Sequence, residues 1–166
     1  MVDLKMGKPR KTKPSLMIIG WMEYLDLPAL GLKQIKAKID TGARTSALHA
    51  THIRVFDHNS EEWVRFQVQS EDDGEPKWIE CPVYDRRDIK NTSGIPEERI
   101  IIKTRLKLVD RSWPITVSLT DRSNMRFAMI VGRTALKKHN IAVHTHRANL
   151  TQNEGQKRHK AERADS

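Results

Sequence analysis

The chain has 166 residues, with a single cysteine, Cys81, and no hydrophobic run long enough to cross a membrane. One cysteine cannot form a disulfide within the chain, which is typical of a protein in a reducing compartment. The apolar run at residues 16–19 is far too short for the core of a secretory signal or for a membrane span. These absences predict a cytoplasmic protein with no membrane association.

Most of the positive charge lies near the two ends of the chain. The formal net charge is +9, and residues 1–15 and 147–166 hold most of the excess Lys and Arg. Both segments lack the apolar side chains that would offset the entropy cost of ordering them. We therefore expect a disordered basic N-terminal tail at 1–15 and a disordered polar C-terminal tail at 147–166. Neither contains an aromatic ring for stacking on bases, so nucleic-acid binding through the tails is the weakest alternative.

One domain, residues 16–146, remains between the tails, and alternating apolar and polar residues predict short strands in it. The segments with this pattern are 35–40, 64–69, 78–84, 100–109, 113–119 and 127–131. Pro82 predicts an edge or a bulge. Residues 85–99, which contain Gly94, predict an exposed loop, and residues 132–140 predict one short helix. Many short strands with one late helix predict an all-β fold, a closed β-barrel.

Asp40 ends one of these predicted strands and is followed by Thr41 and Gly42, in the sequence KIDTGA. A strand that leaves its sheet through an ordinary turn would also tolerate Asp-Thr-Gly. The alternative is that the carboxyl is held in place for chemistry. A second segment bears on this choice, because FAMIVGRTALKKH at residues 127–139 is an apolar strand that ends in Gly132 before a helix.

The two segments, about 90 residues apart, together resemble the lobe of a retropepsin-like aspartic protease. With NTSGIPEER and VSLTDRSNMRFAMIVGR they resemble, over residues 16–145, a bacterial retropepsin-like family that carries the name ATP-dependent zinc protease. The resemblance implies a retropepsin-like closed β-barrel. Members of that family are often encoded beside glutamate ligases of the ATP-grasp type, which add glutamates to protein ends. An association with such a ligase is therefore also implied.

The ATP and the zinc of the family name find little support in the residues. The chain contains neither Gly-x-x-x-x-Gly-Lys-Ser/Thr nor His-Glu-x-x-His. His49 and His52, or His144 and His146, have spacings that could bring two imidazoles together, but no cysteine or carboxylate pattern completes either pair. We expect no cofactor and no metal.

An aspartic mechanism needs two carboxyls that share one proton, so that one acts as a base on water while the other polarises the scissile carbonyl. The chain has a single Asp-Thr-Gly, so the second carboxyl must come from another chain. A two-fold homodimer would place Asp40 against its symmetry mate. By resemblance to retropepsins, Thr41 would hydrogen-bond across the dimer axis. Gly42 allows the tight turn and offers its amide near the carboxylate.

Four further residues are predicted to meet the substrate. Ala43 is the small residue expected beside the scissile bond. The charge of Arg44 would select an acidic substrate, or else form a surface ion pair. Gly94 is the candidate hinge of a covering flap, with a plain surface loop as the alternative. Gly132 belongs to the same set, although we expect it to serve the backbone more than the substrate, with Arg133 as a brace between strands.

The remaining aromatic and sulfur residues are given structural roles. Trp63, Trp78 and Trp113 lie in strand-like segments and are predicted to be core or interface anchors, not a base-stacking platform. Cys81 is predicted to be a small buried hydrophobe.

The leading functional hypothesis is a homodimeric aspartic peptidase that activates water for peptide or amide hydrolysis, with glutamate-modified proteins as candidate substrates. The alternative is a catalytically inactive binding or adaptor module that keeps the retropepsin fold.

Overall fold

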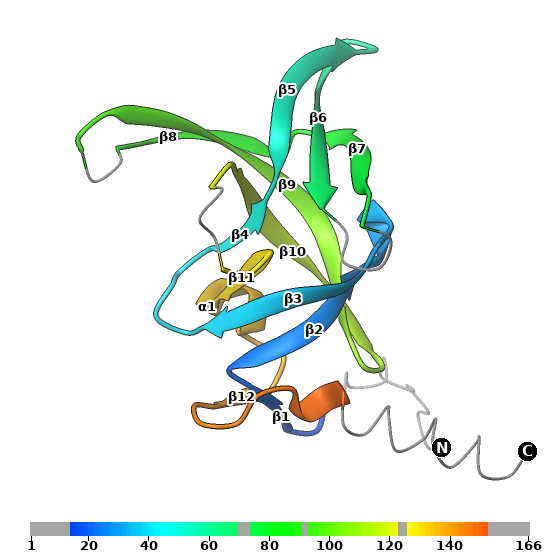
Figure 1. Cartoon of the computed structure of the whole chain (residues 1–166), viewed down its shortest axis with the longest axis vertical. Coiled ribbons are helices and arrows are strands. Elements are labelled where there is room, and N and C mark those ends of the chain that lie inside the picture. Colours follow the sequence, from blue (N-terminus) through cyan, green and yellow to red (C-terminus); the bar gives the residue numbers. More distant parts are fainter. Residues whose placement is uncertain (1–13, 70–73, 91–92, 123–125, 153–166) are drawn as a thin grey trace, which may run out of the picture.

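A computed structural model describes residues 14–69, 74–90, 93–122 and 126–152 (Figure 1). Residues 1–13 and 153–166, which make up most of the two predicted tails, lie outside the described residues. The strands are β1 (Met17–Gly20), β2 (Met22–Leu27), β3 (Leu32–Asp40), β4 (Ser46–His49), β5 (Thr51–His58), β6 (Glu61–Gln69), β7 (Pro76–Pro82), β8 (Asp85–Lys90), β9 (Pro96–Leu108), β10 (Arg111–Thr120), β11 (Met129–Gly132) and β12 (Ile141–His144). The helices are η1 (Pro28–Leu30) and α1 (Arg133–Leu136).

Six strands form a closed barrel in the order β10-β4-β11-β3-β2-β9, and the pairing of β9 with β10 closes it. Alternation along β10 sends Trp113, Ile115 and Val117 into the core, as the sequence pattern requires. Closure leaves the six barrel strands without a free sheet edge between them. The predicted all-β barrel with one short helix after Gly132 is confirmed.

A second, three-stranded sheet of β5, β6 and β7 projects from the barrel (Figure 1). Its inner face is apolar, with Val64, Phe66 and Ile79 buried. The outer face carries Phe56 and Trp63, which are half-buried, and Trp78, which is exposed. Pro82 ends β7, which pairs only with β6 in the described sheet, so the predicted edge position is confirmed.

Residues 85–99, predicted to be an exposed loop, instead form β8 and the start of β9, which pair as an antiparallel hairpin. The pattern failed here because charged side chains occupy both faces of the hairpin and hide the period of two. Arg86 forms ion pairs with Glu62 at 3.3 Å and with Glu98 at 3.2 Å. Such exposed pairs add little stability, and the hairpin is held by its backbone ladder.

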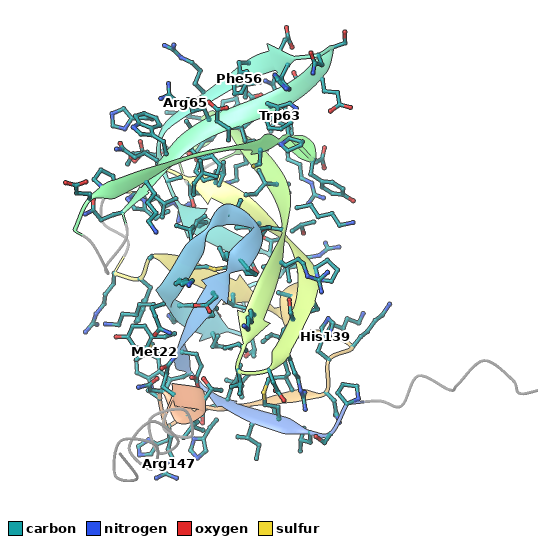
Figure 2. All side chains as sticks on the ribbon, turned by 90° about the vertical axis from the view of Figure 1, so that its right-hand side faces the viewer. Met22, Phe56, Trp63, Arg65, His139 and Arg147 are labelled. Carbon is teal, nitrogen blue, oxygen red and sulfur yellow. The ribbon has the colours of Figure 1, made fainter. Side chains whose placement is uncertain are left out.

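Residues 147–152, predicted from the sequence to be part of the C-terminal tail, lie along the β1–β2 segment. The amide of Trp21 donates to the carbonyl of Arg147 at 3.0 Å, and the amide of Asn149 donates to the carbonyl of Met22 at 2.7 Å. Met22 and Arg147 are labelled near the lower end of the molecule in Figure 2. Sequence composition could not reveal this attachment, since the contacts are made mainly by backbone groups.

Glu23 is the side chain that fixes this segment. It is fully buried, and its carboxylate accepts hydrogen bonds from the amides of Gly20 at 2.6 Å, Leu150 at 2.9 Å and Thr151 at 3.2 Å. The hydroxyl of Thr151 donates a fourth bond at 2.6 Å. A buried carboxylate is tolerated only when donors surround it in this way.

No helix within the described ranges is both long enough and apolar enough to span a lipid bilayer.

Replacing Glu23 with Ala is expected to lower the free energy of unfolding by about 3 kcal/mol or more, because several buried donors lose their acceptor at once. Urea denaturation measures this difference. Glu61→Ala, at an exposed position on β6, is the matched control and is expected to change stability by less than about 0.5 kcal/mol. An equal effect of the two substitutions would contradict the assignment of Glu23 as the anchor of residues 147–152.

Candidate active site

Asp40 is the last residue of β3 and begins a tight turn. Its Oδ1 accepts a hydrogen bond from the Gly42 amide at 3.1 Å, and the Ala43 amide donates to the Asp40 carbonyl, also at 3.1 Å. The side chain of Asp40 is half-buried, whereas Thr41 and Gly42 are exposed. The turn therefore holds Oδ1 of Asp40, while Oδ2 forms no hydrogen bond with the described residues.

Gly132 supports this turn from the neighbouring strand. β11 runs parallel to β3 with Gly132 opposite Asp40, and the Gly132 amide donates to Oγ of Ser46 at 2.9 Å. A Cβ atom added to Gly132 would lie 2.5 Å from the carbonyl carbon and oxygen of Thr45. The loop after Asp40 thus crosses Gly132 at a separation that no side chain allows.

The first residues of α1 fix the carbonyls of the same loop. The amide of Arg133 donates to the Ala43 carbonyl at 2.7 Å, and its Nη1 donates to the Thr41 carbonyl at 3.0 Å. The carbonyl of Arg44 accepts two bonds from Thr134, one from the amide at 3.2 Å and one from the hydroxyl at 2.8 Å. Hydrogen bonds from the first residues of α1 therefore fix the backbone of residues 41–44.

A cavity of about 850 Å³ adjoins the loop. Its lining combines apolar side chains from β3, α1, β12 and the junction of β1 and β2 with polar groups from the loop, from α1 and from the residues after α1 and β12. The lining residues are Trp21, Ile39, Thr41, Arg44, Arg133, Thr134, Leu136, Lys137, Ile141, Val143 and Thr145. β12, which pairs with β1, contributes Ile141 and Val143 to the wall of this cavity.

A comparison with protein families agrees with the barrel and with the Asp-Thr-Gly turn that β11 supports. A family model described as "Retropepsin-like aspartic endopeptidase RimB" matches residues 18–154. The chain belongs to the RimB-like family. The resemblance to retropepsin-like proteins that the sequence suggested is confirmed.

Curated relatives of this RimB-like chain carry a different name. A protein from Desulfotalea psychrophila is 43% identical over 121 residues, and one from Parasynechococcus marenigrum is 42% identical over 122 residues. Both are named "Probable alpha-L-glutamate ligase", and each match covers 72% of this chain and 26% of the relative. The chain therefore spans about a quarter of the length of the curated relatives it matches.

A solved structure shares the fold of the RimB-like chain. A Legionella pneumophila protein with unknown function has a TM-score of 0.69 and 27% sequence identity, over 81% of this chain and 97% of that one.

The structure brings together most of the residues proposed from the sequence. Asp40, Thr41, Gly42, Ala43 and Arg44 lie in one loop, and Gly132 lies directly beneath it. Gly94 does not join them: it lies in the turn between β8 and β9 with a φ of 75°, and that hairpin contributes no residue to the lining of the cavity. Arg44 is exposed and forms no ion pair within the described ranges.

Sequence reasoning missed Ser46 and Thr134, which bond the loop to β11 and α1. A hydroxyl residue at the start of the helix was the available signal for Thr134, because such residues commonly bond to nearby backbone at helix N-termini. Arg133, expected to brace strands, instead braces the loop through Thr41.

The histidine pairs do not form a zinc site in the described part of the chain. Nδ1 of His144 already accepts bonds from the backbone amides of His146 and Arg147, at 3.1 and 3.0 Å. Nδ1 of His49 likewise contacts the backbone, accepting from the Arg122 amide at 3.2 Å. Across residues 14–69, 74–90, 93–122 and 126–152, no three His, Cys, Asp or Glu side chains gather to hold a metal ion. The described residues therefore do not fit the zinc of the family name.

Trp113 supports α1 from the barrel core. It is buried, and its indole Nε1 donates to the Ala135 carbonyl at 2.7 Å. The ring of His139 stacks on it with centroids 4.4 Å apart, and Arg111 donates to the His139 carbonyl at 3.2 Å. Burial lowers the pKa of His139 from its ordinary value, and the positive charge of Arg111 lowers it further.

The other anchors predicted from the sequence differ from Trp113. Trp78 is 49% exposed, so it is not a core residue. Cys81 is only half-buried, but desolvation raises the pKa of its thiol to about 11, so the thiol stays protonated and unreactive near neutral pH.

Gly132→Ala is expected to lower the free energy of unfolding by about 3 kcal/mol, because the added methyl group must displace the backbone of Thr45. Gly74→Ala is the matched control: Gly74 has a φ of 68° but open space around it, so only backbone strain of about 1 kcal/mol is expected. Chemical denaturation of both variants makes the comparison. Equal losses would contradict close packing at Gly132.

Stability is expected to fall as the pH drops below 6.5, the ordinary pKa of histidine, because His139 binds its proton less tightly in the folded chain than in the unfolded chain. The unfolded state then holds more protons, and acid shifts the equilibrium toward it. His139→Gln should flatten this part of the pH dependence, measured by urea unfolding between about pH 7 and about pH 5. An unchanged slope in His139→Gln would contradict this assignment.

Proposed function

We propose that this RimB-like chain is an aspartic peptidase that acts as a homodimer in the cytoplasm, with Asp40 of each chain supplying one catalytic carboxyl. The observation that carries the proposal is the turn at Asp40, Thr41 and Gly42, held over Gly132 and α1 in a barrel of the retropepsin-like family.

Two carboxyls are needed because peptide hydrolysis requires a base and an acid at the same carbon. An ionised carboxylate removes a proton from water, whose oxygen attacks the carbonyl carbon, while the protonated partner donates to the carbonyl oxygen. The C–N bond then breaks as the leaving nitrogen takes up a proton. Repulsion between the two carboxyls separates their pKa values, so that one of them keeps its proton.

The cavity beside the loop supports a second copy of this chain as the source of the other carboxyl. Its apolar lining includes Ile39, Ile141 and Val143, and β12 pairs only with β1 in the described sheet. Ile18 on β1 is 55% exposed. Thr41 and Arg44 line the same cavity. Apolar side chains of a partner chain that filled it would therefore bring the Asp40 turns of the two chains toward each other.

The proposed substrate is an acidic peptide, and glutamate-modified proteins are the proposed substrate class. Arg44 supports it, because an exposed guanidinium on the loop with no ion pair in the described part of the chain is free to bind a carboxylate. The relatives named as probable glutamate ligases support it too, and they favour association of this chain with a ligase of that kind.

A catalytically inactive binding module is the second candidate. Two observations favour it: the Asp40 carboxylate already has a structural partner in the Gly42 amide, and the curated relatives are named as ligases and not as peptidases. Activity of the purified chain separates the two candidates.

Asp40→Asn is expected to lower the rate of hydrolysis of an oligoglutamate peptide by roughly 10²–10⁴-fold or more, since the amide cannot serve as a base. Mass spectrometry of the products measures the rate, and light scattering follows the mass of the chain, which should remain that of a dimer. Asp57→Asn, at an exposed position on β5, is the control and is expected to keep full activity. A metal chelator should leave the rate of the unaltered chain unchanged.

Wild-type rates from Asp40→Asn would exclude the aspartic mechanism. A strictly monomeric mass at concentrations where cleavage proceeds would exclude the shared site. Inhibition by a chelator that zinc alone reverses would show a metallopeptidase instead.

A further inference from the structure

The outer face of the β5–β6–β7 sheet is unusually rich in rings for a solvent-facing surface. The chain has three Phe, four Trp and two Tyr in all. Three of these nine side chains lie on this one face: Phe56 is paired with Trp63, and Trp78 lies opposite Gln67, two outward positions along β6 from Trp63. Figure 2 labels Phe56, Trp63 and Arg65 together on the projecting sheet. Solvent-facing strand positions are ordinarily polar, so aromatic side chains gathered there indicate a binding surface.

One end of this face is hollowed. A cavity of about 360 Å³ is lined by His52, Ile53, Arg54, Arg65 and Trp78, which we call the arginine–tryptophan hollow. The Arg65 guanidinium lies over the Trp78 ring, 4.1 Å from its centroid, and the His52 ring meets the same indole edge-on at 5.7 Å. The cation–π contact holds the Arg65 guanidinium against the indole at the hollow.

The backbone around His52 is shaped for this contact. The register between β5 and β6 shifts between Thr51 and Arg54, which is a β-bulge, and His52 has a φ of 54°. Non-glycine residues pay for such a conformation, and bulges turn a side chain to a new direction. Here the bulge places the imidazole against Trp78.

Two like charges occupy neighbouring positions at the hollow. Arg54 and Arg65 are directly paired across β5 and β6, an arrangement that repulsion disfavours. Glu80 is the carboxylate nearest to Arg65, but at 3.8 Å it is beyond hydrogen-bond distance and both side chains are about half exposed. Arg54 forms no ion pair within the described ranges. A carboxylate bound at the hollow would offset the positive charge of both arginines.

We propose that the arginine–tryptophan hollow binds the carboxylate side chains of an acidic peptide, as a second contact outside the Asp40 loop for the same substrate. This inference rests on the proposed function for its choice of peptide. The two guanidinium groups would each take a carboxylate through paired N–H donors, and Trp78 would pack against the aliphatic stem.

A peptide fits the charges of this face better than a nucleic acid does. A single strand of RNA carries a phosphate on every nucleotide and needs a continuous cationic track. The same face presents Glu80 opposite Arg65, and Glu61 opposite His58 further along β6, which interrupts such a track. An acidic peptide places a charge only where a side chain carries one, and its neutral backbone can pass Glu80.

The test uses the full chain with Asp40→Asn, so that binding is measured without cleavage. Hexaglutamate is titrated while tryptophan fluorescence is followed, with hexaglutamine as the uncharged peptide and hexauridylate as the nucleic acid. Hexaglutamate is expected to change the fluorescence saturably, and Trp78→Phe should remove that change. Arg54→Gln with Arg65→Gln should weaken hexaglutamate binding by roughly tenfold or more, as loss of charge-assisted bonds predicts. Arg105→Gln, an exposed arginine on β9, is the control and should bind as before.

Arg54→Gln alone keeps the test informative if the double variant does not fold, because the Arg54 side chain is exposed. Unchanged affinity in the arginine variants, an equal response to hexaglutamine, or tighter binding of hexauridylate would each overturn the proposal. In the chain with Asp40 intact, loss of both arginines should raise KM for oligoglutamate without lowering kcat. If the chain with Asp40 intact binds hexaglutamate at the hollow but does not cleave it, the proposed peptidase activity is refuted. The proposed peptide-binding role of the hollow is then supported.

Discussion

The position of Asp40 depends on a contact that leaves no room for a side chain. The loop after Asp40 crosses Gly132 so closely that a single methyl group would collide with the backbone of Thr45. Because β11 and β3 are parallel neighbours, this contact stacks the end of one strand on the loop that follows the other. Hydrogen bonds from Arg133 and Thr134 can then reach the loop carbonyls, which fixes the turn before any substrate or partner arrives.

Two supports outside the loop keep this arrangement in place. Trp113 donates a hydrogen bond to the carbonyl of Ala135 in α1, and this bond fixes the position of the helix that carries Arg133. Glu23 holds residues 147–152 along β2 and thereby keeps Trp21 at the wall of the cavity. The surface around Asp40 is thus assembled from both ends of the domain, and the barrel provides the rigid frame between them.

The sequence indicated the barrel and the loop because apolar strands ended in residues with special backbone needs, as at Asp40 and Gly132. The β8–β9 hairpin was missed, since ion-paired charges on both of its faces conceal the alternation that marks a strand. For Trp78 the sequence left core and interface roles open, because alternation shows that a strand has two faces but not which of them the core covers, and its 49% exposure excludes the core role. The anchoring role of Glu23 was beyond any local pattern, because its partner Leu150 lies 127 residues away.

The pairing of β1 with β12 affects how the chain folds during its synthesis. The first strand of the domain has no neighbour of its own sheet until residues 141–144 have been synthesised, so a ribosome must release nearly the whole domain before that pair can form. Contacts between such distant segments also form slowly, because a long loop must close first. The wall of the cavity near Asp40 therefore depends on residues 141–144, and a chain that ends before them would carry the Asp-Thr-Gly turn without that wall.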